Sequence, residues 1–246
     1  QVALHEIGVM AQLQHPNIVE LYGFSRGDVS VYIVMELVEG GSLREFVSYA
    51  AQHLDLVMAT KIAILQEVVA GLEFMHSHGV LHRDIKSANI LLQMEGDEVL
   101  AAKLADFGFA KVRADSGSLA SIQTIRGTPV YMAPELLLQY YQGAAEACYS
   151  KAADIFSLSI VAYEMLTESI LFRAKRFSAA MTASGRRPPF NDEFATRYPQ
   201  LVELISHAWA ANPVDRPSIS EFAAALDLVA EQLPADDGPL LRRDDV

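Results

Sequence analysis

The stretch LHRDIKSANILL, Leu81 to Leu92, constrains the fold of this chain more than any other feature of its sequence. It follows an apolar segment of helical period, residues 58–78, and it ends in an apolar run that predicts a strand. Between these elements Asp84, Lys86 and Asn89 place a carboxylate, an ammonium group and an amide at offsets of zero, two and five residues. The pattern predicts a helix, a polar loop and a strand, with a functional site in the loop.

Charge and composition exclude several classes of partner. Lys and Arg number 19 against 31 Asp and Glu, a net charge of −12 with no long basic tract, so nucleic acid and anionic membranes are poor partners. The chain is 51% apolar and 20% charged, as in ordinary globular proteins. Its single cysteine, Cys148, cannot form an internal disulfide, which favours a reducing, cytoplasmic compartment. No apolar run reaches the roughly 18 residues of a transmembrane helix.

The remaining elements follow from hydrophobic period and turn residues. Apolar residues at three-residue spacing predict an amphipathic helix at residues 4–13, and because no N-cap residue precedes it, the chain is expected to begin inside a helix. Further predicted elements are two antiparallel strands, a helix after EGGS, two strands around the turn MEGDE, and a mostly helical remainder. The two antiparallel strands cover residues 18–24 and 29–38, and the helix after EGGS covers 43–52. The two strands around MEGDE cover 89–92 and 99–105, and the mostly helical remainder covers 134–233.

Three motifs follow HRDIKSAN in the chain. DFG (106–108) comes after a predicted strand, GTPVYMAPE (127–135) closes a long loop rich in serine and threonine, and NPVDRPS (212–218) precedes the last helix. A solvated turn would explain HRDIKSAN alone, but the ordered set resembles the eukaryotic protein kinase family. Loops as long as the one between DFG and GTPVYMAPE are uncommon in compact domains unless they are functional.

The resemblance runs from Val2 to about Leu233 and implies an α+β, protein kinase-like fold. Residues 1–38 would be an incomplete small β lobe, with the family's helix C and two strands. Residues 39–233 would be a complete, mainly α-helical large lobe that carries the catalytic and activation loops. Residues 234–246 would be a polar, frayed tail.

The same resemblance implies ATP and Mg²⁺ as cofactors and a protein as substrate. Asp84 would accept the hydrogen bond of the substrate hydroxyl, and Lys86 would neutralise charge on the transferred phosphate, since phosphoryl transfer requires mainly positioning and charge compensation. Asn89 and Asp106 would supply oxygen ligands of the kind that suits Mg²⁺. The alternatives are a turn cap for Asn89 and a surface carboxylate for Asp106.

Two features bear on the acceptor. Lys86 together with Thr128 resembles serine/threonine kinases rather than tyrosine kinases, and Thr128 is expected to bond both Asp84 and Lys86. The stretches MTASGRRPPF and AWAANPVDRPS are similar to the tyrosine-kinase-like group of serine/threonine kinases. Ala88 stands where kinases that prefer basic substrates often carry a glutamate, so strong basic selectivity is not expected.

Further roles are implied for residues around this centre. The backbone of Glu36 and Val38 resembles the hinge that bonds adenine, with Met35 as gatekeeper and Leu91 beneath the ring; Ser42 is a ribose contact or a helix cap. The resemblance also implies structural roles: His82 and Phe107 would belong to an apolar stack, Asp154 would anchor the catalytic loop, and Glu135 and Arg216 would form a buried ion pair. In regulation, a phosphate on Thr124 in the activation loop would pair with Arg83. The phosphate on Thr124 would come from an upstream kinase or from autophosphorylation.

The resemblance breaks down at the start of the chain. Glu6 stands where the family has its helix-C glutamate, but the sequence contains neither the lysine strand that should precede it nor a GxGxxG loop. Lys103, next to DFG, is on the wrong strand to substitute and is interpreted as a surface lysine. The chain is therefore a fragment of a complete kinase, which the intact site residues favour, or a pseudokinase scaffold. A non-catalytic binding module is a third hypothesis. In either of the first two cases residues 1–246 alone are expected to have little or no activity.

Overall fold

The structure is a computed structural model. It describes residues 8, 11–27, 31–96, 98–106, 111–112, 122–123, 128–143, 147–171, 178–233 and 241–242. Within these ranges no helix is both long enough and apolar enough to cross a membrane.

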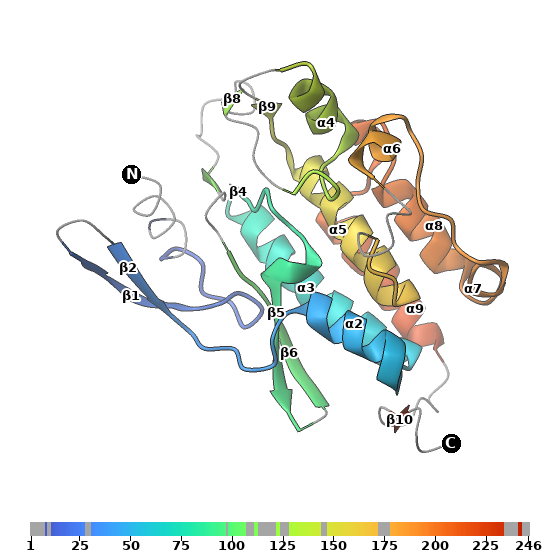
Figure 1. The fold of residues 1–246 in the computed structure, drawn as a ribbon, viewed down its shortest axis with the longest axis horizontal. Helices are drawn as coiled ribbons and strands as arrows, with labels where there is room; N and C mark the ends of the chain where they lie inside the picture. The colour runs from blue at the N-terminus through green and yellow to red at the C-terminus, as the bar shows by residue number, and fades with distance from the viewer. Residues whose placement is uncertain are drawn as a thin grey trace.

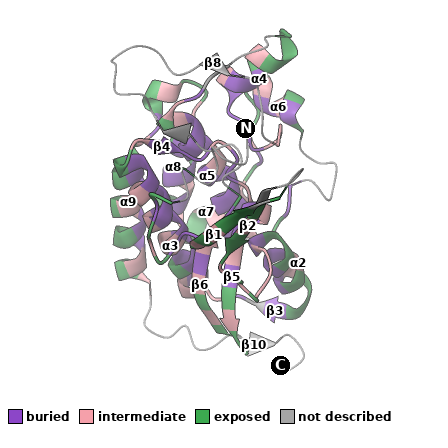
Figure 2. Cartoon of the chain, turned by 90° about the vertical axis from the view of Figure 1, so that its left-hand side faces the viewer, coloured by how far each residue is buried: buried purple, intermediate pink, exposed green. Residues whose placement is uncertain are grey.

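Two buried helices form the centre of the large lobe. Helix α3 (Met58–Ser77) contacts helices α5 (Lys151–Thr167) and α9 (Ile219–Gln232) and strand β6 (Glu98–Leu104), as Figure 1 shows. Buried residues lie all around α3 and α5, as expected for helices enclosed by other elements. Figure 2 shows the contrast with α9, whose outer side is exposed.

The remaining helices surround this pair. They are α2 (Leu43–His53), α4 (Pro134–Tyr141), α6 (Ala179–Ala183), α7 (Asp192–Arg197) and α8 (Pro199–Ala208), with short 3₁₀ turns η1 (Ser87–Asn89) and η2 (Pro213–Asp215). Capping boxes begin α2 at Ser42 and α9 at Ser218, where each serine and the glutamate three residues later satisfy each other's backbone N–H groups. The predicted helices at 43–52 and 58–78 are confirmed to within one residue at each end.

The strands pair as antiparallel hairpins or short two-stranded ladders. The hairpins are β1 (Leu21–Arg26) with β2 (Val31–Met35) and β5 (Ile90–Glu95) with β6. The short ladders are β4 (Val80–Leu81) with β7 (Lys111–Val112), β8 (Ile122–Gln123) with β9 (Ala147–Cys148), and β3 (Leu54–Asp55) with β10 (Leu241–Arg242). Ser25 and Arg26 belong to β1, where the sequence predicted a turn, and β10 lies in the segment that was predicted to be a frayed tail.

The loop that contains His15, Pro16 and Asn17 (the HPN loop), just ahead of β1, joins the first hairpin to the large lobe. Leu104 exchanges two backbone hydrogen bonds with this segment, donating to Asn17 O and accepting from Val19 N, both at 2.9 Å. On the other side the loop touches α3 at Gly71, where a Cβ atom would lie 2.6 Å from Asn17 O. The glycine therefore allows a backbone contact that no larger residue would permit. These contacts hold the HPN loop, and the β1–β2 hairpin that follows it, against β6, the strand that leads to Asp106.

Candidate active site

The catalytic loop, the HRDIKSAN stretch at residues 82–89, is held by one buried carboxylate of α5, that of Asp154. Asp154 Oδ2 accepts from the backbone N–H of His82 at 3.0 Å, and its Oδ1 accepts from that of Arg83 at 2.9 Å. Arg83 has φ of 70°, a left-handed conformation that costs a non-glycine residue about 1–2 kcal/mol. The two bonds fix the chain direction immediately before Asp84. The predicted anchoring contact of Asp154 is thus present in the structure.

Hydrogen bonds and nearby charge keep the Asp154 anchor ionised, whereas burial keeps the neighbouring His82 neutral. Burial alone would raise the pKa of Asp154, but the hydrogen bond and charge of His76, whose Nε2 lies 2.9 Å from Oδ2, help hold that pKa below its ordinary value. Burial lowers the pKa of His82, although the carboxylates of Asp154, Asp84 and Asp106 oppose the shift. His82 therefore packs as an uncharged core residue at neutral pH.

Asp84 is the point where the predicted catalytic residues meet. Its side chain is buried, and its Oδ2 lies 2.5 Å from Lys86 Nζ and accepts from Asn89 Nδ2 at 3.1 Å. Its Oδ1 accepts from the backbone N–H of Thr128 at 3.2 Å and from the Thr128 hydroxyl at 3.4 Å. Thr128 was expected to bond Lys86 as well, but the Lys86 ammonium is directed at Asp84. Asp84 thus ties the GTPVYMAPE stretch (residues 127–135, the docking segment) to the catalytic loop.

The arrangement of Asn89 and Asp106 fits a magnesium ion. Asn89 Nδ2 donates to the backbone carbonyl and the carboxylate of Asp84, so the amide oxygen faces the other way. Its backbone carbonyl accepts from Ala105 N at 2.9 Å, which places Asp106 next to it at the end of the paired strands β5 and β6. Asp106 is exposed and has φ of 62°. An amide oxygen and a carboxylate are ligands that Mg²⁺ accepts while it keeps waters or phosphates in its other positions.

The hinge segment runs along β5. Gly40 N donates to Leu92 O and Leu92 N donates to Gly41 O, both at 2.9 Å, and Ser42 bridges to Leu91. A Cβ atom at Gly40 would lie 2.3 Å from Leu92 O, so only glycine fits there. The Ser42 hydroxyl is the cap of α2 and donates to Glu45 at 2.7 Å. Its expected alternative role as a cap is thus present, and contact with a ribose stays a prediction.

Lys103 is not the free surface residue that the sequence suggested. Its Nζ lies 2.7 Å from Glu36 Oε1, and the two side chains are only 12% and 17% exposed. Glu36 Oε2 also accepts from Glu20 N at 3.2 Å. Lys103 stands opposite Leu91 in the β5–β6 register. The ion pair therefore joins the hinge to β6, the strand before Asp106. The sequence does not show this link, because Glu36 and Lys103 are far apart along the chain.

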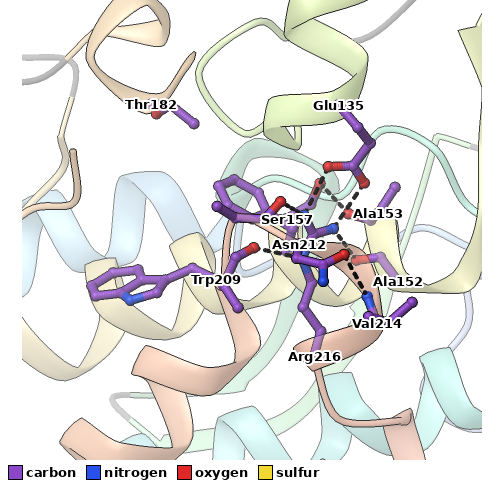
Figure 3. A network of polar contacts seen from close by, with 12 residues as sticks. Glu135, Ala152, Ala153, Ser157, Thr182, Trp209, Asn212, Val214 and Arg216 are labelled. Carbon is purple, nitrogen blue, oxygen red and sulfur yellow. Dashed lines mark hydrogen bonds and ion pairs between the residues drawn. The ribbon is translucent and has the colours of Figure 1, made fainter. Parts of the chain in front are cut away.

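The predicted ion pair between Glu135 and Arg216 is present, as Figure 3 shows. The guanidinium bonds both carboxylate oxygens, at 2.9 and 2.7 Å, and its side chain is fully buried. It also donates to three backbone carbonyls, those of Ala152, Ala210 and Ala211. This network joins α4, which follows the docking segment, to the turn before α9 and to the start of α5.

The other predicted residues fall into two groups. Met35 ends β2 and is 41% exposed, and Val38 follows it in the hinge segment; their contacts with a nucleotide stay predictions. Glu6, Phe107 and Thr124 lie outside the described residues. One further cluster was not predicted: Ser87, Tyr131 and Glu164 meet beneath the catalytic loop.

Comparison with known proteins agrees with this geometry. The chain is 33% identical over 230 residues to putative serine/threonine-protein kinase A of Trypanosoma brucei brucei, covering 89% of this chain and 49% of that protein. It is 33% identical over 227 residues to mouse serine/threonine-protein kinase Nek5, covering 90% and 33%, respectively. It is 36% identical over 252 residues to mitogen-activated protein kinase kinase kinase 2 of Arabidopsis thaliana, covering 94% and 36%. The chain thus spans between a third and a half of the length of these relatives. A family model described as the protein kinase domain matches residues 1–226, and the chain therefore belongs to the protein kinase domain family.

Proposed function

We propose that this protein transfers the γ-phosphate of ATP to serine or threonine hydroxyls of a protein substrate. The observation that supports this best is the convergence of Lys86, Asn89 and Thr128 on the buried carboxylate of Asp84. A purely structural turn has no need for an ammonium, an amide and a docking-segment threonine on one carboxylate. Phosphoryl transfer needs such an arrangement, because most of its catalysis is positioning and charge stabilisation.

Each group has a distinct task in this proposal. Asp84 accepts the hydrogen bond of the incoming hydroxyl, orients its oxygen and takes up its proton as the new O–P bond forms. Lys86, beside Asp84, compensates charge that develops on the transferred group. Asn89 and Asp106 are the residues that would hold Mg²⁺, which neutralises phosphate charge when bound. The hinge backbone at Glu36 and Val38 would hold the adenine.

Support for a serine or threonine acceptor comes from Lys86 and Thr128. Thr128 reaches Asp84 through both its backbone N–H and its hydroxyl, so the docking segment lies next to the group that would receive the substrate proton. Two of the relatives reported above are named as serine/threonine-protein kinases, and the third is named as a mitogen-activated protein kinase kinase kinase. The MTASGRRPPF stretch is similar to the tyrosine-kinase-like group of serine/threonine kinases, and it supports membership of that group.

Regulation and location belong to the same proposal. A phosphate on Thr124, added by an upstream kinase or by the protein itself, would pair with Arg83, whose guanidinium lies over the ring of Tyr149 at 5.1 Å. The net charge of −12 supports protein substrates over nucleic acid, and the single cysteine supports a cytoplasmic location.

The test compares Asp84→Asn with Asp227→Asn in the longest form of the protein that carries this chain. Asp227 is an exposed residue on α9, far from the loop, so its variant controls for the loss of one carboxylate. We expect Asp84→Asn to abolish phosphate transfer to a serine-containing protein substrate and Asp227→Asn to leave it intact. Full turnover by Asp84→Asn would show that the proposed role of Asp84 is wrong.

A kinase-fold scaffold, the alternative raised from the sequence, is the second candidate function. A thermal-shift titration with Mg·ATP separates the two. The free energy of unfolding of the enzyme should rise with the logarithm of the nucleotide concentration once that concentration exceeds the dissociation constant, whereas a scaffold without a nucleotide site should show no shift.

A further inference from the structure

Three oxygen atoms form a closed triangle beneath the catalytic loop. Ser87 Oγ and the Tyr131 hydroxyl each lie 2.8 Å from Glu164 Oε2, and the two hydroxyls lie 2.9 Å apart. The residues come from turn η1, the docking segment ahead of α4, and helix α5, respectively. All three are buried, with Ser87 and Glu164 at 0% exposure.

A count of protons identifies the charge state of the carboxyl group. Each side of the triangle has the length of an O–H···O hydrogen bond, and each such bond requires one proton. The hydroxyls of Ser87 and Tyr131 supply two protons, so a triangle in which every side is a hydrogen bond places the third proton on Glu164. Glu164 Oε1 accepts from the backbone N–H of Leu171 at 3.2 Å, as the carbonyl oxygen of a neutral acid would. Oε2 is then the protonated oxygen.

The ionised alternative is physically poorer. Both hydroxyls would have to donate to Oε2, which would leave their oxygens facing each other at 2.9 Å without a proton between them. Among the described residues no cation forms an ion pair with this carboxyl group, and a buried carboxylate without such a partner is costly. Arg44 of α2 is exposed, Lys86 pairs with Asp84, and Lys61 of α3 pairs with Glu168 at 2.7 Å.

Burial raises the pKa of Glu164 above its ordinary value, and this effect outweighs the hydrogen bonds from Tyr131 and Ser87 and the charge of Arg44, which lower it. The direction agrees with the proton count, although the inference stands on the triangle itself.

We propose that Glu164 is held as a neutral acid and that Ser87, Tyr131 and Glu164 form a ring that positions the catalytic loop against the docking segment. Ser87 directly follows Lys86, and Tyr131 lies three residues after Thr128. The ring is therefore a second tie between the two segments that the contact of Thr128 with Asp84 already joins. Its effect on catalysis rests on the proposed kinase function, whereas its protonation state does not.

The protonation state is tested by the pH dependence of unfolding. A carboxyl group whose pKa is raised on folding gives stability that is complete below the unfolded pKa, near 4.5, and is lost as pH rises toward the folded pKa. In that window the unfolding constant of the wild type, divided by that of Glu164→Gln, should rise about tenfold per pH unit. A ratio that stays flat from pH 5 to pH 7 would overturn the neutral acid.

A second measurement covers the case in which Glu164→Gln does not fold. The infrared spectrum of the folded protein at pH 7 should contain a neutral-carboxyl band that disappears on unfolding. Glu67, whose pKa burial also raises, is replaced by glutamine in this experiment so that it cannot contribute. A spectrum without the band would overturn the proposal.

The positioning role is tested by Ser87→Ala and Tyr131→Phe. The matched controls are Ser159→Ala and Tyr163→Phe on α5, which delete the same hydroxyl types inside the large lobe; those hydroxyls donate to backbone carbonyls and lie outside the ring. We expect each ring variant to lower kcat by roughly tenfold to a hundredfold, as small displacements of catalytic groups do, and the controls to leave it unchanged.

The double variant should be little worse than either single one, because one deletion already opens the ring. Equal kcat losses in ring variants and controls would refute positioning. Absence of any transfer by the wild type would instead refute the kinase function and leave the pH result standing.

Discussion

Replacing Asp154 by asparagine should loosen the catalytic loop while leaving the shape of α5 unchanged. The carboxylate accepts from His82 N and His76 Nε2 on one oxygen and from Arg83 N on the other. Asparagine offers only one acceptor oxygen. Its least costly orientation keeps the His82 side and turns an N–H₂ group toward the Arg83 amide, so that two donors face each other.

The magnitude follows from these contacts. A buried backbone N–H without a partner costs about 1–3 kcal/mol, and the two remaining bonds lose the charge of their acceptor, roughly 1 kcal/mol each. Burying a neutral amide instead of a carboxylate offsets part of this loss. We expect a net loss of about 2–4 kcal/mol in the free energy of unfolding. Arg83, no longer held at φ of 70°, should move away from its left-handed conformation.

Urea unfolding measures the loss, and hydrogen exchange at the Arg83 amide measures the release of the loop. Asp227→Asn, an exposed change on α9, should stay within about 0.5 kcal/mol of the wild type. If Asp154→Asn unfolds at the wild-type midpoint and the Arg83 amide stays protected, Asp154 does not hold the loop and the anchor interpretation is wrong.

Three further perturbations have expected outcomes. Glu135→Gln strands the fully buried guanidinium of Arg216 and should cost about 3–5 kcal/mol in urea unfolding, against little change for the exposed Glu231→Gln; a similar small loss for both would contradict a structural ion pair. Lys103→Met and Glu36→Gln should show a coupling energy of about 1 kcal/mol in a double-mutant cycle, and simple additivity would mean that the hinge and β6 are not joined. Folding lowers the pKa of Asp154, so the stability that its carboxylate contributes is present above the unfolded pKa of 3.8 and is lost as pH falls through the folded pKa. The unfolding midpoints of the wild type and Asp154→Asn should therefore converge in acid, and a constant gap between them would refute this.

The parts of the fold that could be predicted from the sequence are those with a strong local signal. The long apolar helix that became α3 and the hairpin around MEGDE have period and turn residues that specify them without neighbours. The meeting of Asp84 with Asn89 was predictable too, because only four residues separate them. Thr128, which is distant in sequence, was placed by resemblance to a family and not by period or spacing.

The contacts that sequence reasoning missed are between side chains that fold together from distant segments. Glu164 lies within an apolar helix, and nothing in its local pattern shows that Ser87 and Tyr131 bond it. Phe156 is a similar case, because its ring packs against residues that are distant in sequence. In the structure the guanidinium groups of Arg187 and Arg216 both lie 5.1 Å from the centre of its ring. Such packing depends on residues that come together only in three dimensions.

The short contact between Lys86 and Asp84 has a consequence for the order of events in the site. The carboxylate that we propose as the proton acceptor is already occupied by an ammonium group at 2.5 Å, and two further side chains share its oxygens. An arriving hydroxyl must compete with these groups for the carboxylate of Asp84. A phosphate that draws Lys86 toward itself frees the oxygen that Lys86 had occupied. Nucleotide and substrate would then help each other to bind through the swing of a single lysine, with no movement of the backbone.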